Sequence, residues 1–259
     1  MSGPMFIIGG HEDKDGRREI LSSIAQALPR PKLVLATIAS RHPEGYLEAY
    51  RDAFSGLGDV ELVELEVDVE AEDADLSALE GAGGIFLSGG DQRLIIEKMA
   101  GTELEDRVRQ LWSDGGVIAG TSAGASAVGE SMIERGSGDE TYRLGEITLG
   151  QGLGLVTGVI IDQHFAERGR IGRLLGAVAE SPVTLGIGID ENTAVRLEQD
   201  HLAVIGDGSV YVVDGRESAH TNVTSGDSGD ALSLHDVRLH VLSRVDTFDL
   251  STRRPAHPA

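Results

Sequence analysis

Short apolar runs alternate with amphipathic stretches through the first half of the chain. The runs have the length of buried strands, and the stretches between them repeat apolar residues at helical spacing. The predicted strands are Met5–Ile8, Lys32–Ile38, Val60–Val67, Gly84–Leu87 and Val117–Ala119. The predicted helices are Glu19–Leu28, Glu44–Phe54, Leu94–Met99 and Leu104–Trp112. Such alternation predicts right-handed crossovers and a parallel sheet, with a binding site at the carboxyl ends of its strands.

The second half carries shorter runs. A strand at Leu155–Ile161 and a helix at Arg168–Val178 come first. We interpret the next four runs as antiparallel hairpins at the edge of the sheet: Thr184–Ile189, Thr193–Leu197, Leu202–Ile205 and Val210–Val213. A last strand is expected at Leu232–Leu242, loops at Asp68–Glu80 (with a short helix), Glu134–Glu146 and Glu217–Asp230, and a frayed tail at 251–259. We therefore predict one α/β domain over residues 1–259.

A serine stands in the tightest turn of the predicted sheet. Gly120-Thr121-Ser122-Ala123-Gly124 follows the strand Val117–Ala119 and precedes small residues that can begin a helix. Such a turn exposes a nucleophile and aims helix N–H groups at a developing oxyanion. A glycine-rich turn that binds phosphate, or only turns, has the same spelling. The motif alone leaves both interpretations open.

A serine nucleophile needs a base and an acid that orients the base. His164 follows a predicted strand and should lie on the same rim as Ser122, and His11 is the second candidate base. The acid should also follow a strand, where Asp190 and Glu191 are adjacent. Neighbouring side chains on an extended segment point to opposite sides, so we expect one of the two to face the site.

Two further segments suggest substrate recognition. Arg168, Arg170 and Arg173 form a cluster suited to carboxylates, although a solvated helix face would look the same. Gly89-Gly90-Asp91-Gln92 resembles an anion-binding turn, in which a glycine amide could complete an oxyanion hole with the amide of Ala123. No metal-ligand spacing or nucleotide-binding glycine motif is present in the sequence, so we expect no metal and no cofactor.

The amino-acid composition limits the classes of partner that we expect for this protein. The net charge of −21 argues against nucleic acid and anionic membranes, which need a basic face. The absence of cysteine excludes disulfides and a thiol nucleophile. The sequence has no signal-peptide pattern and no apolar run of membrane-spanning length, so we expect a cytoplasmic protein.

Taken together, five segments resemble the serine-peptidase family that contains the cyanophycinases and aspartyl dipeptidase. They are Phe6–Gly10, Gly89–Gln92, Gly120–Ala125, Ile161–Phe165 with the Arg-x-Arg-x-x-Arg that follows, and Gly186–Ala194, in the family's order. The resemblance implies a class I glutamine-amidotransferase-like (flavodoxin-like) three-layer sandwich. Its sheet would be mostly parallel, with helices on both faces and antiparallel edge strands.

The resemblance also implies roles for particular residues. Ser122 would be the nucleophile, His164 the general base and Glu191 the orienting acid, with the amides of Gly90 and Ala123 as oxyanion hole. The substrate-binding positions would be Gln92, Asp162, Gln163, Arg168, Arg170 and Arg173.

The implied activity is exolytic degradation of cyanophycin (multi-L-arginyl-poly-L-aspartate) to β-Asp-Arg dipeptides through an acyl-enzyme, in a homodimer. Arginine donors suit the free carboxylates of that polymer, and acids such as Asp162 suit its guanidinium groups. Two alternatives stay open: an aspartyl or isoaspartyl dipeptidase, and a non-catalytic module that binds an arginine-rich polymer.

Overall fold

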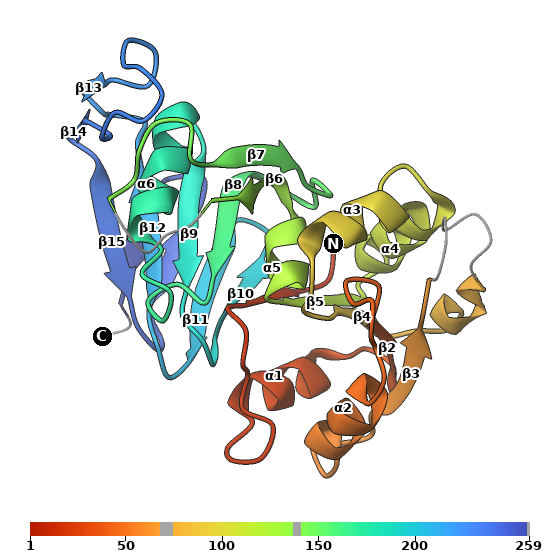
Figure 1. Cartoon of the computed structure of the whole chain (residues 1–259). Coiled ribbons are helices and arrows are strands. Elements are labelled where there is room, and N and C mark those ends of the chain that lie inside the picture. Colours follow the sequence, from red (N-terminus) through yellow and green to blue (C-terminus); the bar gives the residue numbers. More distant parts are fainter. Residues whose placement is uncertain (68–74, 137–140, 258–259) are drawn as a thin grey trace.

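The computed structural model describes residues 1–67, 75–136 and 141–257 and contains two large sheets (Figure 1). The predicted loop at Asp68–Glu80 lies partly outside these ranges, and its described end contains the 3₁₀ helix η2 (Leu76–Leu79). Within the described ranges no helix combines the length and the apolar character needed to span a membrane.

The larger sheet has a parallel half and an antiparallel half. Its order is β17-β16-β11-β10-β1-β5-β4-β2-β3. The parallel strands are β1 (Met5–Ile8), β2 (Lys32–Ala36), β3 (Glu61–Leu65), β4 (Gly84–Leu87) and β5 (Val117–Thr121). The antiparallel strands are β10 (Thr193–Glu198), β11 (His201–Gly206), β16 (Thr247–Asp249) and β17 (Arg254–Ala256). All five strands of the first set were predicted from the apolar runs.

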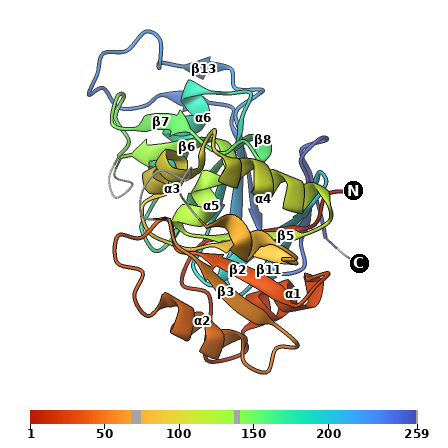
Figure 2. The ribbon, with the colours of Figure 1, turned by 90° about the vertical axis from the view of Figure 1, so that its right-hand side faces the viewer.

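Helices cover both faces of this sheet (Figure 2). Helices α1 (Glu19–Ala27) and α2 (Tyr46–Phe54) lie on one face, where Ile20, Ile24 and Phe54 share a core with Phe6 and Ile8. Helices α3 (Gln92–Met99) and α4 (Glu103–Ser113) lie on the other, in a core with the alternate β1 residues. Because successive strand residues point to opposite faces, the wholly apolar β1 can serve both cores.

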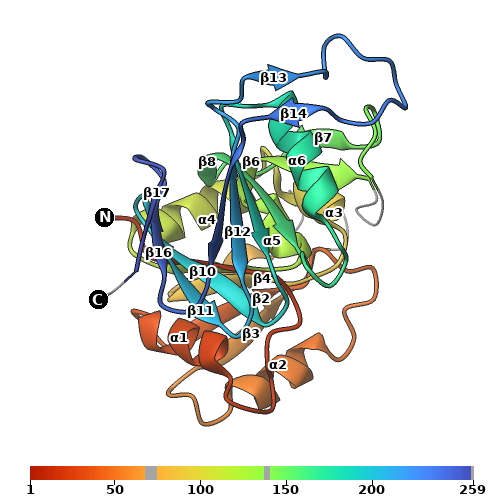
Figure 3. The same ribbon diagram turned by 90° about the vertical axis from the view of Figure 1, so that its left-hand side faces the viewer.

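The smaller sheet corrects the prediction of edge hairpins on one sheet. Its order is β15-β12-β9-β8-β6-β7, so the runs predicted at 184–189 and 210–213 pair here (Figure 3). The strands are β6 (Gly129–Arg135), β7 (Thr148–Gln151), β8 (Val156–Gln163), β9 (Leu185–Ile189), β12 (Val210–Asp214) and β15 (Arg238–Leu242). Strands β8 and β9 are parallel because helix α6 (Ile171–Glu180) connects them as a crossover.

The structure also differs from the expectations in several smaller points. Strands β6 and β7 were not predicted, because their polar residues mask the alternation. The predicted tail at 251–259 contains β17, whose backbone pairs with β16, and only 258–259 lie outside the described residues. The predicted 217–230 loop contains β13 (His220–Thr221), which pairs with β14 (Leu234–His235). The single strand predicted at Leu232–Leu242 is divided into β14 and β15, which belong to different sheets.

Candidate active site

The serine turn joins β5 to the short helix α5 (Ala123–Ala127), as the sequence predicted. Ser122 has φ 52° and ψ −108°, a conformation that residues other than glycine rarely adopt. The glycines on either side leave no room for a side chain. A Cβ on Gly120 would lie 2.5 Å from the Gly124 carbonyl oxygen, and one on Gly124 would lie 2.3 Å from that of Leu87. Close packing against β4 therefore makes Ser122 project from a sharp bend.

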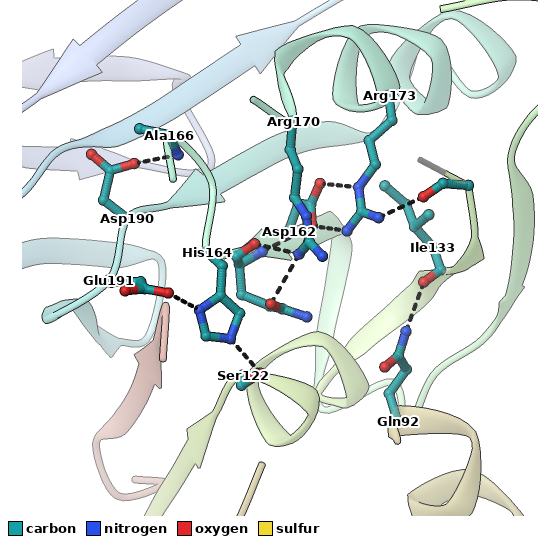
Figure 4. Close-up of polar contacts among 12 residues, drawn as sticks. Gln92, Ser122, Ile133, Asp162, His164, Ala166, Arg170, Arg173, Asp190 and Glu191 are labelled. Carbon is teal, nitrogen blue, oxygen red and sulfur yellow. Dashed lines mark hydrogen bonds and ion pairs between the residues drawn. The ribbon is translucent and has the colours of Figure 1, made fainter. Parts of the chain in front are cut away.

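His164 follows β8 and meets the serine. Its Nε2 lies 2.8 Å from the Oγ of Ser122 (Figure 4). The backbone N–H of His164 donates to the Gly9 carbonyl over 2.8 Å, which ties the end of β8 to the end of β1. A Cβ on Gly10 would lie 2.3 Å from the imidazole Cε1, so this glycine leaves space for the ring. Of the two candidate bases, His164 is the one that contacts the serine.

The adjacent acids Asp190 and Glu191 turn in different directions after β9. An oxygen of Glu191 lies 2.6 Å from Nδ1 of His164 (Figure 4). The Asp190 carboxylate instead accepts backbone N–H groups of Ala166 and Ser209, over 2.9 and 3.0 Å. Of the two adjacent acids, which the residues alone had left as alternatives, Glu191 is therefore the one that contacts the imidazole.

His11 contacts the acid rather than the serine. Its Nδ1 lies 3.2 Å from the second carboxylate oxygen of Glu191, and its ring meets that of His164 edge to face at 5.2 Å. One nitrogen donor atom from each histidine and one Glu191 oxygen lie within 4.8 Å of one another. These three side chains are the group in the described residues that could hold a metal ion.

Burial lowers the pKa of His164 below its ordinary value. The hydrogen bond that Glu191 accepts from the imidazole opposes this shift, and the charge of Arg168 adds to it. The imidazole is thus biased toward its neutral form. A neutral ring whose Nδ1–H donates to Glu191 presents a free Nε2 lone pair to Ser122, which is the arrangement a general base needs.

Two of the three clustered arginines have an internal partner. The Asp162 carboxylate, 1% exposed, accepts from Nε of Arg173 over 2.6 Å and from Nη1 of Arg170 over 3.2 Å. The same Nη1 donates to the side-chain oxygen of Gln163 over 3.0 Å, and Arg173 also donates to the Gly136 carbonyl over 2.8 Å. Burial lowers the pKa of Arg170 to about 10. This network forms a buried wall beside His164 (Figure 4).

The other predicted binding residues differ in their freedom. Arg168 is exposed and has no carboxylate within 4 Å among residues 1–67, 75–136 and 141–257. Gln92 donates its side-chain amide to the Ile133 carbonyl over 3.0 Å. Gly90 has φ 147°, and a Cβ there would lie 2.2 Å from the Ala39 carbonyl oxygen. The hydrogen bonds of the described residues include none donated by the amides of Gly90 or Ala123.

A cavity of about 350 Å³ adjoins Ser122 and His164 on the side of Gly90. Sequence reasoning missed other side chains that line it, among them Glu12, Lys14, Tyr46 and Tyr50. Glu12 is buried and accepts hydrogen bonds from Lys14, Tyr50 and Thr121, over 2.7, 2.5 and 2.6 Å. Burial raises the pKa of this carboxyl, but Lys14 and the hydrogen bonds outweigh burial and hold it below the ordinary value. The available signal in the sequence was the charged pair Glu12 and Lys14 in the segment that follows β1.

Several cyanophycinases resemble the chain over almost its whole length. It is 38% identical to a cyanophycinase of Synechococcus elongatus over 98% of this chain and 81% of that protein. It is 40% identical to one of a Nostoc species over 96% of this chain and 86% of that protein. A solved peptidase from an acI-B1 actinobacterium superposes with a TM-score of 0.66 at 24% identity, covering 89% of this chain and 95% of that one, which supports the fold.

A family model covers most of the same sequence. Residues 5–205 match the model of peptidase family S51. This range includes Ser122, His164 and Glu191, and it ends at β11. The match spans far more than half of the 259 residues, and relatives at 38–40% identity extend over nearly all of them. The chain therefore belongs to peptidase family S51.

Proposed function

We propose that this protein is a cyanophycinase, an exolytic serine peptidase that releases β-Asp-Arg dipeptides from cyanophycin. The observation that carries the proposal is the continuous chain of hydrogen bonds from Ser122 through His164 to Glu191. That chain stands in a family S51 member whose relatives named cyanophycinase span nearly its full length.

In the proposed reaction His164 removes the proton of the Ser122 hydroxyl while the oxygen attacks a backbone carbonyl of the polymer. The negative charge that forms on the carbonyl oxygen is received by the amides of Gly90 and Ala123. The Nδ1–H bond to Glu191 stabilises the imidazolium. His164 then protonates the leaving amine, the bond to that nitrogen breaks, and an acyl-enzyme remains. Water, activated by the same histidine, hydrolyses the ester and restores Ser122.

We propose that two parts of the site recognise the polymer: an exposed cation and a buried polar network. Arg168 is exposed beside the base and lacks an internal carboxylate among the described residues, so it can pair with a carboxylate of the polymer. Asp162, Gln163, Arg170 and Arg173 bond to one another, so their contribution is a rigid polar surface. Gln92, at the start of α3, is a further binding residue in this proposal, and its amide already donates to the Ile133 carbonyl.

We further propose a class I glutamine-amidotransferase-like fold, a single folding unit over 1–259, a cytoplasmic location and a homodimer. The parallel β1–β5 half-sheet with helices on both faces supports the fold class, since a strand-to-helix elbow at its carboxyl edge carries the nucleophile. Light scattering after gel filtration measures the oligomeric state, and a monomer at micromolar concentration would contradict the homodimer.

One experiment tests the function. Purified protein is incubated with cyanophycin, and the products are identified by mass spectrometry, with Ser122→Ala as the matched control. We expect β-Asp-Arg from the unaltered protein and none above background from the variant. Hydrolysis of Asp-X or isoaspartyl dipeptides without release from the polymer would instead support a dipeptidase. Polymer binding without any hydrolysis would support a binding module.

A further inference from the structure

Three side chains of types that can bind a metal ion converge after three strands. His11 follows β1, His164 follows β8 and Glu191 follows β9, and one donor atom of each lies within 4.8 Å of the others. Two imidazoles and one carboxylate are a ligand set that zinc sites use, with the fourth position left to water. His11 contributes nothing to the proposed proton transfer from Ser122, so its place beside Glu191 lacks an explanation in catalysis.

The distances suit a zinc ion after a small adjustment. From Zn–N and Zn–O bonds of about 2.0–2.2 Å, two ligand atoms on one tetrahedral ion lie about 3.3 Å apart. Nδ1 of His11 already lies 3.2 Å from a Glu191 oxygen. The 2.6 Å between Nδ1 of His164 and the other oxygen is a hydrogen-bond length, and it must lengthen when an ion replaces the proton. The His11 side chain is 71% exposed, which leaves a route of entry.

We propose that His11, His164 and Glu191 form a Zn²⁺ site whose occupation switches off the Ser122 nucleophile. A ring nitrogen binds zinc through its lone pair. Coordination at Nδ1 of His164 therefore moves the proton of that neutral ring to Nε2, and no proton is gained or lost. Nε2 then carries hydrogen and cannot accept the proton of Ser122, which lies 2.8 Å away. The same ion binds the carboxylate of Glu191, so this carboxylate no longer stabilises the imidazolium.

The surrounding charges permit a cation. Glu167 lies beside the site, where its carboxylate accepts the backbone N–H of Glu191 over 3.2 Å. Lys14, on the cavity side, is paired with Glu12 at 2.7 Å. Arg168 is the opposing charge next to His164. The chain as a whole carries a formal charge of −21, so its long-range field attracts divalent cations.

The test measures zinc binding directly, in protein variants that lack the Ser122 hydroxyl and therefore have no turnover. Zn²⁺ alone is titrated calorimetrically into Ser122→Ala and into the double variants Ser122→Ala/His11→Ala and Ser122→Ala/His201→Ala. His201 is the matched control: its Nδ1 lies 3.3 Å from an Asp249 oxygen and it is similarly exposed, but Asp249 has no second imidazole partner in the ion pairs of the described residues. We expect one zinc per chain, with affinity weakened on the order of ten-fold or more by His11→Ala and unchanged by His201→Ala.

A second arm rests on the proposed function. Zinc should inhibit release of β-Asp-Arg by the unaltered protein, a chelator should restore it, and His11→Ala should need on the order of ten-fold more zinc. The titration keeps its meaning even if the protein has another substrate, so the two proposals can fail separately. No saturable binding to Ser122→Ala, or equal affinity in the His11→Ala variant, would overturn the site. Zinc that binds there without inhibiting would overturn the switch.

Discussion

The adjacent acids Asp190 and Glu191 make different contacts, one with the backbone and the other with the two histidines. Asp190 accepts two backbone N–H groups and is 7% exposed, whereas Glu191 reaches both histidines. The carboxylate of Asp190 holds the β9 turn against the segment after His164. In the proposed mechanism, the carboxylate of Glu191 sets the tautomer of His164. Substitution should therefore separate stability from turnover.

Glu191→Gln should lower kcat by about 10⁴-fold, because an amide fixes the wrong tautomer of His164, and should leave the melting temperature nearly unchanged. Asp190→Asn should do the reverse, since one of its two backbone acceptor contacts is weakened, at a cost of about 1–3 kcal/mol in unfolding free energy. Steady-state kinetics on the polymer and thermal unfolding of both variants measure these two effects. The opposite ranking would transfer the orienting role to Asp190.

The pH dependence should report the environment of His164. Its pKa is lowered by burial, so the neutral base persists to lower pH, and the acidic limb of kcat/KM should fall below the ordinary histidine value of about 6.5. Arg168→Gln removes a cation that helps to lower this pKa, so the limb should move to higher pH. Arg168→Lys keeps the charge and should leave the limb in place. A limb that does not move in Arg168→Gln would contradict the electrostatic role.

Arg173 tests the interpretation of the arginine cluster. Arg173→Ala leaves the buried Asp162 carboxylate with Arg170 alone, so we expect a loss of about 3 kcal/mol in unfolding free energy. Arg168→Ala removes an exposed side chain and should change stability by less than about 0.5 kcal/mol. Urea unfolding compares the two. Unchanged stability in Arg173→Ala together with a raised KM would return this guanidinium to direct substrate binding.

At the scale of elements, strong apolar runs were predictable and pairing partners were not. The strands β1, β2, β4 and β5 are nearly continuous runs of apolar residues, because both of their faces are buried, whereas the edge strand β3 contains both apolar and polar residues. Strands β9 and β12 have an equally clear pattern, but periodicity does not say which sheet a strand joins. That choice follows from the crossover through α6, which places β9 beside β8.

The candidate site shows the same division. Ser122, His164 and Glu191 each follow a strand, and strand ends at one sheet edge were expected to meet. They do meet, but β5 belongs to the larger sheet and β8 and β9 to the smaller one. The pairing of Asp162 with Arg170 and Arg173 could not be predicted, since it depends on the orientation of the first turn of α6. The role of Glu12 depends on contacts with α2 and β5, which lie far from it in sequence.

The turn after β1 should be as sensitive as the serine elbow. Gly10→Ala places a Cβ 2.3 Å from the His164 ring, so the imidazole must shift and kcat should fall by about 10²-fold. Gly56→Ala is the matched control. Gly56 also has positive φ, at 76°, but no heavy atom lies within 4 Å of a Cβ there, so only a backbone cost of about 1–2 kcal/mol is expected. Full activity in Gly10→Ala would show that the ring position tolerates displacement.

At the scale of the whole molecule, one core joins the two sheets. The largest cluster of buried side chains contains Ile7 and Ile118 from the larger sheet and Val159, Ile187 and Val212 from the smaller one. Helix α5, which begins directly after Ser122, contributes Ala123, Ala125 and Ala127 to the same cluster. The site therefore lies where the two sheets share their packing.

This shared core predicts a single cooperative transition on unfolding. Calorimetric and van't Hoff enthalpies should agree if the sheets unfold together, once any subunit dissociation is taken into account. Scanning calorimetry at several protein concentrations measures both quantities. Two resolved transitions, or an excess of calorimetric over van't Hoff enthalpy at every concentration, would contradict the single unit that we propose for residues 1–259.

Four residues other than glycine adopt left-handed backbone torsions around the catalytic groups. Their φ values are 49° for His11, 52° for Ser122, 47° for His164 and 47° for Asn192. Each such residue costs on the order of 1 kcal/mol relative to glycine. Selection of this protein for thermal stability alone would therefore favour His11→Gly and Ser122→Gly, whereas the buried ring of His164 is held by its contacts. Variants selected for thermal stability alone would therefore lose catalytic activity early. Screens for thermostable variants of this fold must retain a test of turnover.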